Sequence, residues 1–135
     1  MLTKYDLRKY KAIKAEILQL QEQLTELKSV MVAPKIPQLT GMPFGGSSEP
    51  DKIGNIVAKA SKLQDLYYTK LEELVELQET IENAIAGLES QEQLLIRLYY
   101  FSNYTWEQVA VRLNYSWQHV HKLHRGILEK LAKQA

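Results

Sequence analysis

A chain of 135 residues is long enough for one ordinary domain, or for one small domain joined to an extended helical element. It contains no cysteine, which excludes a disulfide framework and a thiolate zinc site. No apolar run approaches the length of a membrane span, and the N-terminus lacks the apolar stretch of an export signal. We therefore expect a soluble protein of the cytoplasm with no membrane partner.

The net charge of +1 conceals a strong asymmetry along the chain. Residues 97–135 hold six basic and two acidic residues, whereas residues 51–96 hold four basic and nine acidic ones. Residues 1–50 carry a smaller excess of two positive charges. Solvated helix faces explain the acidic middle, but the basic C-terminal segment favours an anionic partner such as nucleic acid.

Residues 1–32 are expected to form one long amphipathic helix. Their apolar residues alternate spacings of three and four, which is the pattern of a coiled-coil seam. The residues of this first stripe are Tyr10, Ile13, Ile17, Leu20, Leu24, Leu27 and Met31.

Residues 33–50 are expected to be a linker, because they contain all four prolines of the chain and three of its six glycines. A second long helix is predicted over 51–88, with Ser48 and Asp51 as its N-terminal cap and Pro50 in its first turn. Its apolar stripe consists of Ile53, Ile56, Ala60, Leu63, Tyr67, Leu71, Leu74, Leu77, Ile81, Ile85 and Leu88.

Neither apolar stripe can remain exposed to water, because covering a row of large side chains is worth many kcal/mol. Two arrangements cover them: an antiparallel hairpin within one chain, or pairing with another copy. We favour a hairpin that also self-associates into a dimer or a larger homo-oligomer. Gly87 and Ser90 are expected to end the second helix, and Ser90 with Gln93 to cap the next one.

Residues 89–135 show the spacing of a helix-turn-helix domain. Thr105 and Ser116 are N-cap residues, and Thr105 with Gln108 fits a capping box. Asn114 lies where the chain must turn, and asparagine readily takes the left-handed conformation. Ala110 is small where two helices should approach closely. The expected apolar faces consist of Val109 and Leu113 on the first helix and Val120, Leu123, Ile127, Leu128 and Leu131 on the second.

This segment resembles the fourth region of bacterial sigma-70 factors. The residues that match its pattern are Arg97, Tyr100, Thr105, Val109, Ala110, Leu113, Ser116, Val120, Leu128 and Leu131. The run 114–116 with Val120 and 123–126 is more similar to small phage and prophage activators, the RinA-like and ArpU-like regulators. Segments 39–46 and 51–54 are also similar to a stretch upstream in many of those proteins.

The resemblance implies an all-α DNA-binding protein, in which a long N-terminal helical hairpin or coiled coil precedes the helix-turn-helix. In sigma region 4, the first, second and sixth residues of the recognition helix read bases, and here these are Trp117, Gln118 and Lys122. Gln118 suits adenine and Lys122 suits guanine. Phosphate contacts are expected from Thr105, His119, His121 and Arg125. Two of the three reading positions depart from the usual Arg and Glu, which argues against a promoter −35 element as the target.

Three histidines and several aromatic residues in the same region invite other interpretations. His121 and His124 have a metal-compatible spacing, but no Cys or Asp nearby completes a site, so we expect no metal. His124 is expected to lie against the first helix of the motif. Trp106 and Trp117 occupy first turns, which are commonly exposed, and the run 99–101 is expected to be core.

The function expected from these features is sequence-specific binding of double-stranded DNA by a transcription regulator of phage or prophage type, in a bacterial host. No cofactor is expected, and no phosphate loop or nucleophile motif points to an enzyme. Two alternatives stay open. One is an adaptor that binds host RNA polymerase with little DNA affinity of its own, and the other is a DNA-binding protein of phage DNA packaging.

Overall fold

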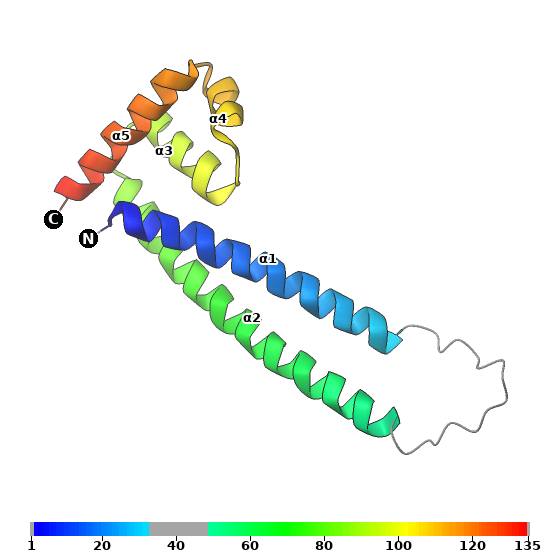
Figure 1. Ribbon diagram of the computed structural model, residues 1–135. Coiled ribbons are helices and arrows are strands. Elements are labelled where there is room, and N and C mark those ends of the chain that lie inside the picture. Colours follow the sequence, from blue (N-terminus) through cyan, green and yellow to red (C-terminus); the bar gives the residue numbers. More distant parts are fainter. Residues whose placement is uncertain (1, 33–48, 135) are drawn as a thin grey trace. The chain divides into compact units, whose positions relative to one another are not determined.

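The computed structural model describes residues 2–32 and 49–134 of the chain. Within them the elements are all helical: α1 (Lys4–Val32), α2 (Glu49–Ile85), α3 (Ser90–Ile96), the π-helical turn η1 (Arg97–Phe101), α4 (Trp106–Leu113) and α5 (Trp117–Lys133) (Figure 1). The all-α prediction, with a long N-terminal helix ahead of a helix-turn-helix, is therefore confirmed. No helix in the described ranges combines the length and apolar character needed to cross a membrane.

The first helix begins at Lys4 because Thr3 and Asp6 cap it. The Thr3 N–H donates to the Asp6 carboxylate at 2.9 Å, which satisfies one of the backbone donors that a helix start leaves unpaired. The observed α1 therefore covers most of the residues over which the long amphipathic helix was expected, 1–32. The linker prediction for 33–50 and the cap expected at Ser48 fall outside the described residues, except that α2 already begins at Glu49.

The second helix ends earlier than the predicted residue 88. After Ile85 the chain turns, and the Leu88 N–H donates to the Ile85 carbonyl at 2.9 Å. The cap expected from Ser90 and Gln93 is wrong, because Glu89 occupies the N-cap of α3. The Glu92 carboxylate accepts from the Glu89 N–H at 3.1 Å and fixes this register.

The chain divides into two compact units, and the first comprises residues 1–15 and 72–135. In this unit the start of α1 packs on the end of α2: the Tyr10 hydroxyl donates to Gln78 at 3.0 Å, and Lys9 pairs with Glu73 at 3.6 Å. The helices α3, η1, α4 and α5 complete the same core. Its fully buried large side chains are Leu7, Ile81, Ile85, Leu95, Ile96, Val109, Val120, Ile127 and Leu131.

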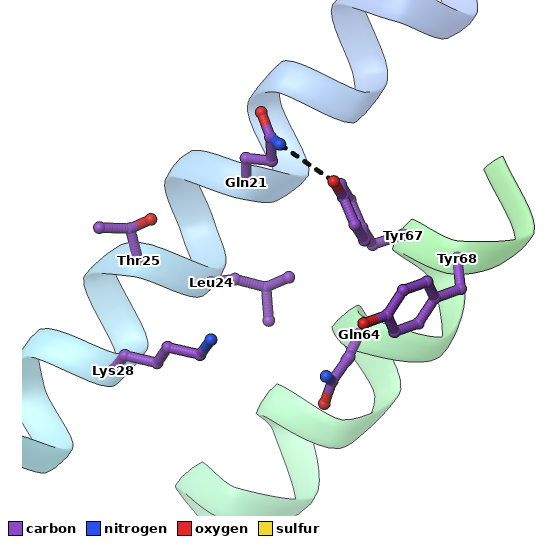
Figure 2. A pocket seen from close by; sticks show the side chains of 7 residues that line it. All are labelled: Gln21, Leu24, Thr25, Lys28, Gln64, Tyr67 and Tyr68. Atoms are coloured by element: carbon purple, nitrogen blue, oxygen red, sulfur yellow. Dashed lines mark hydrogen bonds between the residues drawn. The ribbon is translucent and has the colours of Figure 1, made fainter. Parts of the chain in front are cut away.

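The second unit, residues 16–71, is an antiparallel pair formed by the rest of α1 and the start of α2 (Figure 1). Gln21 donates to the Tyr67 hydroxyl at 3.0 Å, and Lys70 lies 3.2 Å from Glu16. A cavity of about 360 Å³ opens beside this contact; Figure 2 shows Leu24 projecting into it near Tyr68. Antiparallel pairing within one chain, one of the two arrangements expected, is therefore present.

The apolar stripes are covered unevenly in the second unit. Ile17 and Leu20 are buried, but Leu24 and Leu27 are only half-buried. Ile53, expected on the second stripe, is 47% exposed. Other large apolar side chains of this unit are also exposed, namely Leu18, Val30, Val57, Leu66 and Tyr68. Pairing of α1 with α2 therefore leaves apolar surface uncovered here.

Candidate nucleic-acid interface

The turn between α4 and α5 has the geometry that the sequence predicts. Asn114 adopts the left-handed conformation with φ of 63° and ends α4. The Tyr115 N–H donates to the Ala110 carbonyl at 3.0 Å, and the Asn114 N–H to the Val111 carbonyl at 3.2 Å. These two bonds form a Schellman motif, which satisfies two of the last carbonyls of α4 and ends the helix.

Side-chain caps fix the start of each helix of the motif. The Thr105 hydroxyl accepts from the Gln108 N–H at 3.2 Å, while the Gln108 side chain accepts from the Thr105 N–H at 2.9 Å. The Ser116 hydroxyl accepts from the His119 N–H at 3.1 Å and begins α5. The caps predicted at Thr105 and Ser116, and the capping box of Thr105 with Gln108, are therefore confirmed. Thr105 is exposed and its hydroxyl proton remains a donor, as the expected phosphate contact requires.

The apolar faces of the two helices meet in the core of the first unit. Val109 and Leu113 of α4 are buried, as their spacing predicted, and the small Ala110 is buried as well. On α5, five residues were expected inside: Val120, Ile127 and Leu131 are buried, whereas Leu123 and Leu128 are half-buried. This packing leaves the opposite face of α5 to solvent.

The solvent face of α5 carries the residues expected to read bases. Trp117 is 49% exposed, and Gln118 and Lys122 are exposed one helical turn apart. Arg125 continues this face, and His119 is exposed with its ring 4.5 Å from that of Tyr115. From residue 117 to residue 128 the helix contains no Asp or Glu. This part of α5 therefore presents positive charge and hydrogen-bonding groups to solvent.

His121 differs from the other expected phosphate contacts. Its ring lies 4.8 Å from Trp106 and 3.9 Å from Trp117, between centroids. Its Nε2 atom is buried and has no hydrogen-bond partner among the described residues. A phosphate contact by His121 therefore stays a prediction. A phosphate could approach this ring only through the cavity that His121 lines together with residues of α1, η1 and α4.

An aromatic cluster supports the start of both helices. Trp106, expected in an exposed position, is half-buried and stacks on Tyr99 with centroids 3.7 Å apart. His124 packs on Trp106 at 4.7 Å, as expected, and its Nε2 lies 2.7 Å from the buried Tyr100 hydroxyl. Burial, assisted by the charge of Lys4, lowers the pKa of His124 to about 4. Burial also raises the pKa of the Tyr100 hydroxyl, so both groups are neutral at pH 7.

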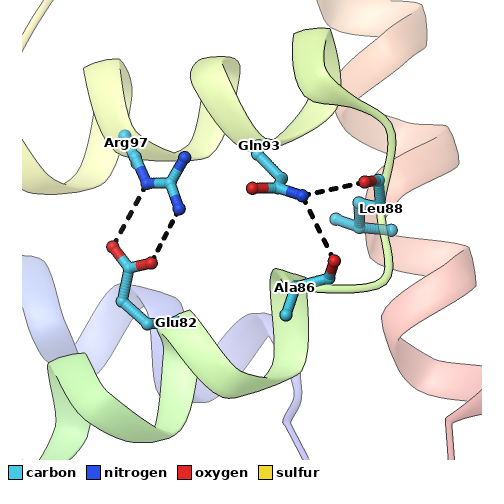
Figure 3. Close-up of polar contacts among 5 residues, drawn as sticks. All are labelled: Glu82, Ala86, Leu88, Gln93 and Arg97. Atoms are coloured by element: carbon cyan, nitrogen blue, oxygen red, sulfur yellow. Dashed lines mark hydrogen bonds and ion pairs between the residues drawn. The ribbon is translucent and has the colours of Figure 1, made fainter.

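Two ion pairs that were not predicted from the sequence join the helices around the motif: one connects η1 to α2, and the other connects α5 to α3. Arg97 donates two hydrogen bonds to Glu82, at 3.2 and 2.8 Å, and the Gln93 side chain donates to the Ala86 and Leu88 carbonyls (Figure 3). The bonds from Arg97 lower the pKa of the Glu82 carboxyl. These contacts fasten η1 and α3 to the end of α2.

The second pair joins α3 to α5. Glu92 is only 4% exposed, and Lys130 donates to both of its carboxylate oxygens, at 3.0 and 2.8 Å. This contact fixes the C-terminal half of α5 and therefore the direction in which its N-terminal half presents Gln118 and Lys122.

The structure also brings basic residues of α1 to this region, which the sequence analysis missed. The Lys11 ammonium lies 3.6 Å from the centroid of the Tyr99 ring, and Lys14 donates to the Phe101 carbonyl. Lys4 and Arg8 line the same cavity as His121 and His124. The spacing of Lys4, Arg8 and Lys11 on one helix face was the available signal. No cluster of three or more metal-binding side chains occurs within the described ranges.

Comparison with known proteins agrees with this geometry. Residues 84–133 match the protein family described as Sigma-70, region 4, which is less than half of the chain. No curated protein and no solved structure matches the chain. The segment is therefore a sigma-70 region 4-like helix-turn-helix domain, a kind of domain that binds DNA and regulates transcription.

Proposed function

We propose that this region 4-like domain makes the chain a sequence-specific DNA-binding transcription regulator of phage or prophage type, acting in the cytoplasm of a bacterial host. The observation that carries the proposal is the exposed face of α5 with Gln118, Lys122 and Arg125, which contains no acidic residue from position 117 to position 128. An α-helix fits the major groove of B-DNA, and this face supplies donors and acceptors for base edges.

The three reading positions have distinct chemistry. The Gln118 amide both donates and accepts, so it can form two hydrogen bonds with the N6 and N7 atoms of adenine. The Lys122 ammonium can donate to O6 and N7 of guanine. Trp117, which is 49% exposed, supplies an apolar edge for a thymine methyl group. Together these positions would read a short half-site.

Phosphate contacts orient the domain on the duplex without reading sequence. Thr105 at the start of α4, together with His119 and Arg125 of α5, is exposed and suited to this role. His121 would contribute through the cavity that it lines. Each cation that neutralises a phosphate releases counterions, so binding should weaken steeply with salt.

We also propose that the second unit pairs with a second copy of the chain. Its exposed Leu18, Leu66 and Tyr68 leave apolar surface uncovered by the antiparallel contact of α1 with α2. A dimer would bring two domains to two half-sites, and the second contact would then benefit from a high effective concentration.

A polymerase-binding adaptor is the second candidate function, and one observation on α4 favours it. Val111 is 82% exposed and lies beside Tyr104 and Arg112 at a cavity of about 340 Å³. An exposed branched apolar side chain flanked by a tyrosine and an arginine suits a small protein contact. In that case Val111→Glu would abolish binding to RNA polymerase and leave binding to DNA unchanged.

A gel-shift experiment tests the main proposal. The 135-residue chain is mixed with DNA from upstream of its own coding sequence and with random DNA, each with and without RNA polymerase. A specific complex without polymerase supports the regulator. A complex that requires polymerase supports the adaptor and contradicts a regulator that binds DNA on its own.

A further inference from the structure

A cavity of about 280 Å³ lies between the start of α1 and the helix-turn-helix, within the first unit. Three cations of α1, Lys4, Arg8 and Lys11, line one side of it. They are spaced four and three residues apart, so they share one face of the helix. Rings of η1, α4 and α5 form the other side, and no carboxylate lines the cavity.

The cations are not engaged by acidic residues. Lys4 and Arg8 are exposed, and neither forms an ion pair with a carboxylate in the described parts of the chain. The nearest acidic residue in sequence, Asp6, is already bonded to Thr3 at the helix start. Lys11 is held over the Tyr99 ring, an arrangement that keeps its ammonium at the cavity without neutralising it.

The opposite side of the cavity includes the ring of His121. Nε2 of His121 is buried and makes no hydrogen bond to any described residue. Buried polar atoms are normally paired, so this nitrogen is exceptional, although it has almost no surface open to the cavity. The charge of the cavity therefore comes from its three cations, and a group that fits three cations with no carboxylate beside them is a phosphate.

Two neighbours of the cavity belong to the proposed DNA-binding face. Thr105 directly precedes Trp106, and Lys122 directly follows His121, where Trp106 and His121 both line the cavity. A phosphate held here would therefore lie beside the residues proposed to contact the duplex. We propose that the cavity binds a backbone phosphate of the DNA that α5 reads, so that the start of α1 is part of the DNA-binding surface.

This inference rests on the proposed DNA-binding function and adds a contact that lies outside residues 84–133. It also gives the long helices a direct effect on DNA affinity. A change in how α1 packs on the domain would move Lys4, Arg8 and Lys11 together.

The test is the salt dependence of DNA binding by the full-length chain. The double variant Lys4→Gln, Arg8→Gln is compared with the wild type and with Lys59→Gln, Lys62→Gln, which removes two exposed lysines of α2 in the second unit. The slope of log K against log salt concentration should become shallower by about 0.9 for each phosphate contact that is lost. Affinity for specific and random DNA should fall by the same factor, and the control should keep the wild-type slope.

A second pair of variants distinguishes loss of the positive charge at position 8 from a structural effect of the substitution. Arg8→Lys keeps the cation and should keep the wild-type slope, whereas Arg8→Gln should not. A double variant that retains the wild-type slope, while the wild type binds DNA, overturns the inference and leaves the proposed function intact. Saturable binding of inorganic phosphate to the DNA-free protein, with no change in the DNA slope, would likewise overturn it in favour of a free-anion site. A wild type that binds no DNA would remove the proposed function itself.

Discussion

The hydroxyl of Tyr100 and Nε2 of His124 lie 2.7 Å apart and join η1 to α5 beneath the recognition face. Burial lowers the pKa of His124 to about 4 from its ordinary 6.5, and Lys4 and His121 add smaller effects of the same sign. The folded protein therefore keeps the imidazole neutral under conditions in which the unfolded chain would protonate it. This contact couples the stability of the domain to pH.

The first prediction is that the free energy of unfolding falls as pH is lowered from about 6.5 to about 4. Between these values the unfolded chain binds a proton that the folded chain does not, so the stability present above 6.5 is progressively lost. The loss should be roughly 2 kcal/mol once partial solvent exposure of the ring is allowed for. Urea unfolding measured at several pH values gives this quantity.

The control for this prediction is His124→Gln, which keeps a polar partner for Tyr100 but cannot titrate. Its free energy of unfolding should change less between these pH values than that of the wild type, because only the contribution of the other groups remains. Identical pH profiles for the two proteins would contradict a depressed pKa at His124.

The second prediction concerns base reading. Gln118→Ala and Lys122→Ala should each weaken binding to the specific site by roughly 1–3 kcal/mol, because each removes hydrogen bonds to a base edge. Gln118→Ala should affect random DNA less, since a neutral side chain releases no counterions. Fluorescence anisotropy with specific and random duplexes measures both affinities. Equal losses on the two duplexes for Gln118→Ala would argue against base reading, and Lys62→Ala provides a matched surface control.

The third prediction concerns the ion pair that joins α3 to α5. Lys130→Met should lower the melting temperature, because it leaves the buried Glu92 carboxylate with the Glu89 N–H as its remaining partner. Adding Glu92→Gln to this variant should restore part of the loss, since a neutral amide needs no counter-ion. Thermal unfolding followed by circular dichroism checks both results. A double variant no more stable than Lys130→Met would show that the pair has only a packing role.

The fourth prediction is that residues 89–135 retain helical structure and bind DNA alone, but more weakly than the full chain. The fragment keeps both caps of the motif, at Thr105 and Ser116, and the buried face of α5. It loses the bonds from Arg97 to Glu82 and the contact of Lys11 with Tyr99, so it should also melt at a lower temperature. A fragment without helical circular dichroism would show that the end of α2 is essential for folding.

Sequence reasoning succeeded where the controlling interactions are local. The caps at Thr105 and Ser116 and the left-handed Asn114 involve partners no more than five residues away. It failed at the cap of α3, where Ser90 is the better cap by residue type but Glu89 takes the position. There the buried Leu88 and the Glu92 carboxylate determine at which residue α3 begins, and the cap preferences of single residues do not predict either effect.

The parts of the site that the sequence did not reveal depend on partners far apart in the chain. Glu92 and Lys130 are separated by 38 residues. A glutamate is rarely buried unless it is paired, and nothing in the local sequence identifies Lys130 as the partner. The cavity needs the start of α1 to lie against Trp106 and His121, about a hundred residues away in sequence. Helical periodicity places Lys4, Arg8 and Lys11 on one face but does not say what that face meets.

The last prediction is that the chain is a dimer at micromolar concentration, held by the second unit. Leu20 is buried in the contact of α1 with α2, and Leu24 projects into the cavity of Figure 2. Replacing both with Glu places charge in apolar surroundings, which is costly without a partner. This variant should sediment as a monomer and lose cooperative DNA binding, while Gln19→Glu with Gln23→Glu adds the same charge at exposed positions and should remain dimeric.

A further pair of variants distinguishes contact between chains from contact within one chain. Leu18 and Leu66 are 47% and 44% exposed, so replacing them with Glu should disturb the antiparallel pair far less than replacing Leu20 and Leu24. If a second copy covers this surface, that variant should also sediment as a monomer, with unchanged helical circular dichroism and reduced cooperativity on DNA. Sedimentation of the wild type as a monomer would contradict the dimer, because no second copy of the chain would then cover the exposed leucines.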